Sequence, residues 1–73
     1  MSKTDEMFKK LGYIKVEDSK SNIEYRKTGD GNYLEIDFWK DDNTVSKNNY
    51  RNMGYITMQE LQAINEKVKE LEW

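Results

Sequence analysis

The sequence predicts a single small α+β domain spanning residues 1–73: a short N-terminal helix, a three- to four-stranded antiparallel sheet, and a long C-terminal amphipathic helix packed on one sheet face. Two patterns carry this prediction. Between residues 14 and 47, apolar side chains recur at every second position in runs separated by short polar turns, which is typical of hairpin-linked strands. Between residues 57 and 71 they recur at spacings of three and four, which is typical of a helix with one apolar face.

The first expected element is a helix of about two turns that ends near Gly12. Ser2 or Thr4 is suited to cap it, because a hydroxyl at this position accepts a hydrogen bond from a free backbone N–H group. Gly12 is suited to the positive φ that ends many helices. Phe8 and Leu11 would share one face. A helix this short is stable only when such a face packs against another element.

Strands are expected over residues 14–17, 23–26 and 33–39, and a fourth strand over residues 44–47 is left open. Residues 28–32 contain two glycines and an asparagine and form the clearest turn signal in the chain. Alternation along the three strands predicts which side chains face the C-terminal helix. They are Ile14, Val16, Ile23, Tyr25, Leu34, Ile36 and Phe38.

The C-terminal helix has the clearest start signal of any element. Thr57 is the expected N-cap, Glu60 completes a capping box, and Ile56 is placed to staple onto Leu61. The expected buried stripe consists of Met58, Leu61, Ile64, Val68 and Leu71, and the expected solvent side carries Gln59, Gln62, Glu66, Lys67 and Glu70.

Composition removes the commonest catalytic and metal-binding groups. The chain has no His and no Cys, so the usual general base, thiolate nucleophile and soft metal ligands are missing. We therefore expect a non-enzymatic protein with no catalytic residues, no cofactor and no metal site. A net charge of −2 offers no basic surface for nucleic acid. Without a membrane-length apolar run, and with a charged segment over residues 1–10, the chain is expected to be cytoplasmic.

The third strand carries the candidate partner-binding site on its second set of side chains. These four residues are Tyr33, Glu35, Asp37 and Trp39. They would lie on the sheet face that the C-terminal helix does not cover, and Trp and Tyr are enriched at binding hot spots. The open alternative is that the first helix or residues 50–55 cover Trp39, which would then belong to a second small core.

The acidic residues of this face admit a further interpretation. Glu35 and Asp37, with Glu24 on the neighbouring strand, could bind a divalent ion or exchange protons. Acids on a solvent-facing strand are usually only solvated, and this is the interpretation that the sequence favours.

Both ends of the chain show a resemblance to known proteins. Residues 7–13 (MFKKLGY), 54–65 (GYITMQELQAIN) and 71–73 (LEW) resemble segments of small uncharacterised proteins that phages and prophages of Gram-positive bacteria encode. The resemblance implies an accessory gene of a mobile element whose product resides in the bacterial cytoplasm. It also implies a class of function, because small acidic phage proteins often bind and block host proteins, including defence nucleases.

The leading prediction is thus a phage-type accessory protein that binds a host protein and, in its sharper form, inhibits it, as an anti-CRISPR or other anti-defence inhibitor does. The alternative is a structural or self-assembling homodimer that pairs through the same face or through a free strand edge. A nucleic-acid binder that stacks bases on its aromatic side chains is disfavoured by the acidic charge balance.

Overall fold

A computed structural model of the chain describes residues 2–29, 32–50 and 56–73, and confirms the predicted α+β class. Its four strands form one antiparallel sheet in the order β1-β2-β3-β4, so the fourth strand that the sequence left open is present. The predicted turn at residues 30–31 and the ambiguous segment at residues 51–54 lie outside the described residues. The elements are α1 (Lys3–Lys10), β1 (Ile14–Asp18), β2 (Asn22–Gly29), β3 (Asn32–Trp39), β4 (Thr44–Tyr50) and α2 (Met58–Glu70).

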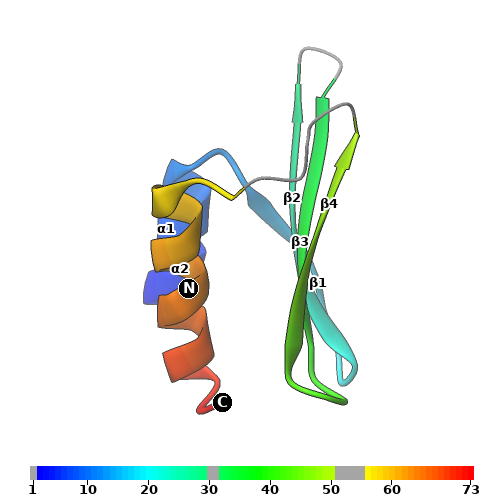
Figure 1. The fold of residues 1–73 in the computed structure, drawn as a ribbon, viewed down its shortest axis with the longest axis vertical. Coiled ribbons are helices and arrows are strands. Elements are labelled where there is room, and N and C mark those ends of the chain that lie inside the picture. Colours follow the sequence, from blue (N-terminus) through cyan, green and yellow to red (C-terminus); the bar gives the residue numbers. More distant parts are fainter. Residues whose placement is uncertain (1, 30–31, 51–55) are drawn as a thin grey trace.

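Both helices lie side by side on one face of the sheet (Figure 1). An antiparallel sheet commonly buries one face in this way and leaves the other in water. The sheet face opposite the helices carries no helix in the described part of the chain (Figure 1). We call it the open face.

The core between helices and sheet is built around Phe8 of α1. Its ring stacks on Tyr25 at a centroid distance of 4.0 Å, and meets Tyr13 and Phe38 edge-on at 5.9 and 6.0 Å. Aromatic rings bury large apolar areas, so this cluster supplies much of the burial that a small domain needs. In the described part of the chain, the remaining buried apolar side chains are Ile23, Ile36, Ala63 and Ile64.

The N-terminal helix follows its predicted pattern. Ser2 is the N-cap and accepts a hydrogen bond from the backbone N–H of Asp5. Gly12 adopts the expected positive φ, at 94°. Phe8 is buried and Leu11 packs partly buried against the core, so the face that they share does dock on the sheet.

The predicted facing of the first strand is wrong. Ile14 and Val16 are 68% and 44% exposed, whereas Tyr13, directly before the strand, is buried. A register shift between Lys15 and Glu17 breaks the alternation on which the prediction rested. Lys15 turns toward the helices instead, because its ammonium group pairs with Asp5 of α1 at 3.0 Å.

The α2 helix begins at the predicted capping box, and Thr57 and Glu60 make both of its hydrogen bonds. Its predicted buried stripe is only partly correct. Ile64 is buried and Val68 and Leu71 pack against the core, but Met58 is 67% exposed and Leu61 is also exposed.

The helix is rotated so that two charged residues, Glu60 and Lys67, face inward with Ala63. This rotation is stable because both charges find partners: Glu60 pairs with Lys47, and Lys67 with Glu70. Lys67 was expected on the solvent side of the helix, so that expectation is wrong.

Candidate binding face of the sheet

The structure places all four predicted site residues of β3 on the open face. Their neighbours along the strand, Ile36 and Phe38, are buried on the helix side, so strict alternation sends the other set outward. The exposure of this outward set varies: Trp39 is 39% exposed and Asp37 only 1%. Tyr33 and Glu35 are half-buried.

The burial of Asp37 contradicts the interpretation of these acids as simply solvated. Asp37 sits in an inner strand, with Glu24 of β2 and Ser46 of β4 directly opposite in register. The side-chain amide of Asn22 donates to Asp37 Oδ1 at 3.2 Å. Asp37 Oδ2 is buried and receives no hydrogen bond from the described residues. A buried carboxylate oxygen without a donor is rare and energetically costly.

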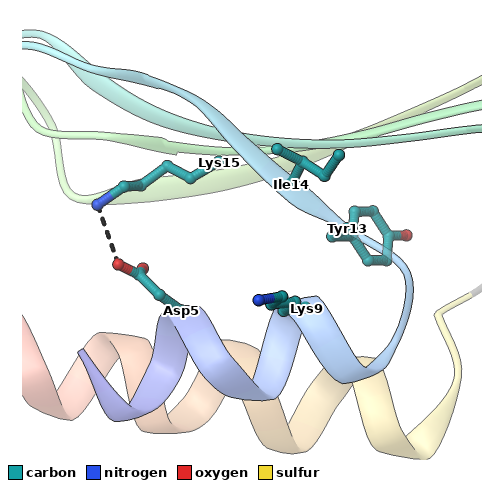
Figure 2. A pocket seen from close by; sticks show the side chains of 5 residues that line it. All are labelled: Asp5, Lys9, Tyr13, Ile14 and Lys15. Carbon is teal, nitrogen blue, oxygen red and sulfur yellow. Dashed lines mark hydrogen bonds and ion pairs between the residues drawn. The ribbon is translucent and has the colours of Figure 1, made fainter. Parts of the chain in front are cut away.

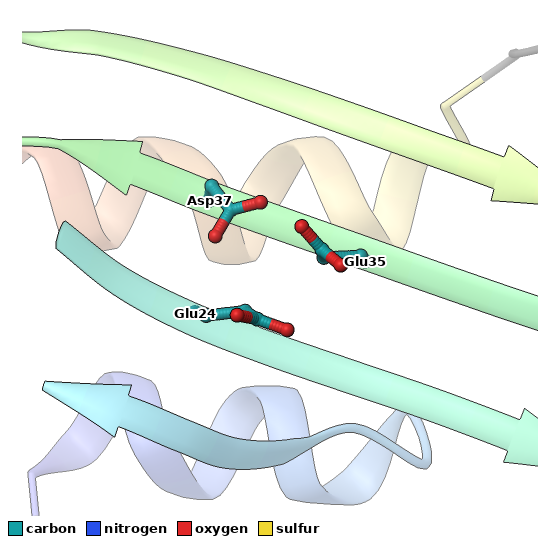
Figure 3. A group of neighbouring side chains, drawn as sticks. All are labelled: Glu24, Glu35 and Asp37. Atoms are coloured by element: carbon teal, nitrogen blue, oxygen red, sulfur yellow. The ribbon is translucent and has the colours of Figure 1, made fainter.

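Three carboxylates meet at this point. Oxygens of Glu24, Glu35 and Asp37 all lie within 4.8 Å of one another (Figure 3). We call these three residues the carboxylate cluster. The strand register produces it, because Glu24 pairs with Asp37 across the β2–β3 ladder and Glu35 lies two residues away on the same face.

The cluster perturbs the acidity of its members. Burial, followed by the neighbouring Glu35 carboxyl, raises the pKa of Asp37 to about 7. A hydrogen bond with the Asp37 carboxyl, followed by one from Tyr33, lowers the pKa of Glu35. With both groups ionised no hydrogen bond can form between them, so the two carboxyls share one proton over a range of pH.

Arg26 is the residue of this site that sequence analysis missed. Its Nε and Nη2 donate to Glu24 Oε2 at 3.1 and 2.7 Å, and its guanidinium lies 5.4 Å from the centre of the Tyr33 ring. Tyr33 in turn donates to Glu35 Oε1 at 2.5 Å. The spacing of Glu24 and Arg26, two residues apart on a strand, was the available signal for a same-face pair.

Trp39 is held at the end of the patch by β4. Its indole Nε1 donates to Ser46 Oγ at 2.9 Å. The alternative in which the first helix covers Trp39 is wrong, because α1 packs on the other face of the sheet (Figure 1). Of the segment proposed as its other cover, residues 51–55 lie outside the described part of the chain.

A surface pocket of about 620 Å³ lies between α1 and β1 and is the other candidate location (Figure 2). Its polar groups already hold the helix to the sheet. Asp5 accepts hydrogen bonds from Tyr25 at 2.5 Å and Lys15 at 3.0 Å. Burial alone would raise the pKa of Asp5, but these bonds outweigh it and lower the pKa to about 2. We therefore assign this pocket a structural role. Its lining residues are Asp5, Lys9, Tyr13, Ile14 and Lys15.

Comparison of the chain with known protein families, curated proteins and solved structures gave no match. Within the part of the chain that the structure describes, neither helix is long and apolar enough to cross a membrane. The chemistry of the open face therefore carries the functional argument.

Proposed function

We propose that this chain is a non-enzymatic binding module that engages a protein partner through the open face of its sheet. The contact residues are Tyr33, Glu35 and Trp39, and the buried Asp37 contributes negative charge to the same patch. One observation carries the proposal: the sheet face opposite both helices presents a Trp and a Tyr on either side of the carboxylate cluster, each held by a hydrogen bond to a neighbouring side chain.

The arrangement suits recognition of a protein surface for two physical reasons. The bonds Tyr33–Glu35 and Trp39–Ser46 fix the two rings before a partner arrives, so less side-chain entropy is lost on binding. The acids between the rings attract basic side chains, which sets the orientation of the partner and speeds its approach. The same acids repel nucleic-acid phosphates, so a protein is the proposed partner.

The resemblance to phage and prophage proteins suggests which kind of protein the partner is and what binding does to it. The partner is then a bacterial host protein in the cytoplasm, and occupation of its surface inhibits it. A defence nuclease such as a CRISPR effector fits this form, because nucleases bind DNA or RNA through basic grooves and an acidic, aromatic patch is complementary to such a groove.

The proposal is tested with a photo-crosslinking amino acid placed at Thr44, an exposed residue that pairs with Trp39 in the β3–β4 register and leaves the bond between Trp39 and Ser46 intact. Crosslinked host proteins are identified, purified and measured against the chain by calorimetry. Replacing Tyr33 and Trp39 with Ser together should weaken binding at least about 100-fold, because two hot-spot rings are lost. Circular dichroism should show the wild-type fold.

The matched control is the double variant Met58→Ser, Leu61→Ser. It removes exposed apolar side chains from α2, outside the open face. This control should bind like the wild type. Unchanged affinity in the folded Tyr33→Ser, Trp39→Ser variant would rule out the open face as the contact surface.

Self-assembly through a strand edge is the second candidate, and the exposure of Ile14 and Val16 on the edge strand β1 favours it. The register shift between Lys15 and Glu17 opposes self-assembly, because an irregular edge that carries charged side chains hinders pairing with another strand. Light scattering over a wide range of protein concentration separates the two functions. A dimer that Ile14→Lys abolishes supports self-assembly, and a monomer throughout supports the binding module.

A further inference from the structure

The carboxylate cluster has the dimensions of a single cation site. In Figure 3, Glu35 and Asp37 lie next to each other on β3, and Glu24 reaches the same point from β2. The three carboxylate oxygens are within 4.8 Å of one another. Oxygen ligands bind Ca²⁺ at about 2.4 Å, so ligands on opposite sides of one ion are about 4.8 Å apart. Three oxygens this close need only small movements of their side chains, and none of the strands, to contact one ion.

An independent feature of the site also indicates a ligand. Asp37 is 1% exposed, and its Oδ2 atom is buried and receives no hydrogen bond from the described residues. Asn22 donates to Oδ1 only, so when the carboxyl is ionised its Oδ2 atom faces neither water nor a protein donor, which is unfavourable unless a positive charge lies against it. A proton shared between Asp37 and Glu35 joins only two of the three carboxylates, and Glu24 lies outside that pair.

The local charge balance matches a divalent ion. Among the described residues, Arg26 is the basic group that pairs with the cluster, and both of its hydrogen bonds go to one atom, Glu24 Oε2. Three ionised carboxylates and one guanidinium leave two negative charges. On β4, the residues opposite Asp37 and Glu35 are Ser46 and Asn48, which add no charge.

We propose that Glu24, Glu35 and Asp37 bind one hard divalent cation of the Ca²⁺ or Mg²⁺ class on the open face. The ligand set consists of oxygen atoms, which these ions prefer, and the chain has no His or Cys to favour zinc or copper. Water completes the coordination shell. With three protein ligands the site is weak, with a dissociation constant of about 10⁻⁴ to 10⁻³ M. A bound divalent ion neutralises the acids that the proposed partner-binding function uses, so the ion and a basic partner surface compete for the open face.

The first test is thermal unfolding of the isolated protein after treatment with EDTA and dialysis. Addition of 10 mM CaCl₂ or MgCl₂, compared with KCl at the same ionic strength, should raise Tm by about 5 to 10 °C. Asp37→Asn and Glu24→Gln should each remove most of this increase. Asp41→Asn, which changes an exposed acid outside the cluster, should retain it.

The second test locates the ion with Mn²⁺ as a paramagnetic probe. Substoichiometric Mn²⁺ should broaden the backbone amide resonances of Glu24, Glu35 and Asp37 before those elsewhere, and excess Ca²⁺ should restore them. An unchanged Tm in CaCl₂ and MgCl₂, an equal increase in Asp37→Asn, or broadening centred elsewhere would each overturn the proposal.

Discussion

Tyr13 donates a hydrogen bond of 2.6 Å to Glu60, a residue 47 positions later in the chain. The same carboxylate accepts hydrogen bonds from the ammonium group of Lys47, at 2.7 Å, and from the backbone N–H of Thr57, the N-cap of α2. One buried side chain thus caps α2 and ties it to both edges of the sheet. Burial, followed by this hydrogen bond, raises the pKa of the Tyr13 phenol, so it remains a donor at all ordinary pH values.

Replacing Glu60 with Gln should destabilise the protein by about 3 kcal/mol at pH 7. Gln keeps the size of the side chain but removes the negative charge that faces Lys47, and both of those side chains are less than 10% exposed. Urea unfolding followed by circular dichroism measures the change as a lower midpoint with an unchanged slope.

The matched control is Glu66→Gln on the same helix. Glu66 pairs with the exposed Lys69 at 3.6 Å, and an ion pair of this kind contributes little. Its loss should change the free energy of unfolding by less than about 0.5 kcal/mol. Equal effects of the two variants would show that the buried carboxylate has no special role.

Asp5 should make the protein sensitive to acid between pH 4 and pH 2. Its pKa is about 2 in the folded protein against 3.8 ordinarily, because hydrogen bonds from Tyr25 and Lys15 outweigh the effect of burial. A depressed pKa stabilises the fold above pH 4, and this contribution disappears as the pH falls toward 2. The contribution is about 1 to 2 kcal/mol after allowance for solvent screening.

The measurement is the free energy of unfolding of Asp5→Asn as a function of pH. The variant should be less stable than the wild type at pH 6, and the difference should shrink toward pH 2. Glu6→Gln changes an exposed acid in the same helical turn and should follow the wild-type curve. A difference between Asp5→Asn and the wild type that stays constant with pH would contradict the assignment to this carboxylate.

Asp37→Asn should stabilise the cation-free protein at pH 8. The pKa of Asp37 is raised to about 7, first by burial and then by Glu35. The unfolded chain releases the Asp37 proton near pH 4 and the folded chain keeps it up to pH 7, so wild-type stability falls across this interval. The facing groups are Glu24 and Arg26 on β2 and Glu35 on β3, while Ser46 and Asn48 on β4 are neutral.

The size of the stabilisation by Asp37→Asn follows from the raised pKa of Asp37. An amide carries no charge to desolvate and can donate to the Glu35 carboxylate, so the variant should gain about 3 kcal/mol at pH 8 and little at pH 4. Chemical unfolding in EDTA at both pH values measures it. A variant less stable than the wild type at pH 8 would show that the cluster stabilises the fold.

Local signals predicted most of the fold. The helices start after the N-caps Ser2 and Thr57, and the first helix ends near Gly12. Each of these residues acts within one turn of the chain, through its side chain or its backbone freedom. The third strand was equally clear, since its strict alternation coincides with burial on one face. Features of this kind depend on neighbours in sequence, which a single sequence contains in full.

The errors arose where a long-range partner decides which way a side chain faces. Lys15 and Lys67 look like solvent-facing residues, yet both turn inward toward Asp5, which lies ten residues before Lys15 and on the other helix from Lys67. With these pairs formed, α2 and β1 turn charged side chains inward at positions where the apolar pattern places them in solvent. Hydrophobic periodicity cannot register them, because it follows apolar side chains and not ion pairs between distant residues.

The sequence predicted which residues of β3 share the open face, but not the contacts between strands or the burial of Asp37. The four residues of β3 share the open face as alternation required. Only the register of β2 on β3 brings Glu24 against Asp37, and only the neighbouring strands bury Asp37. A three-dimensional arrangement of this kind is set by turn length and pairing, which residue types along one strand do not specify.

Ile14 and Ile23 provide a direct test of the corrected facing of β1, because the sequence pattern places both in the core. In the structure Ile23 is buried in the sheet's inner face and Ile14 is largely exposed. Ile23→Thr should therefore cost about 2 kcal/mol, whereas Ile14→Thr should cost less than about 0.5 kcal/mol. Both variants keep a β-branched side chain, so strand propensity changes little and burial is the main difference between them. Urea unfolding of the two variants measures this difference. Equal losses would mean that Ile14 is packed against something in solution, and a second copy of the chain on the β1 edge would then be the first partner to examine by light scattering.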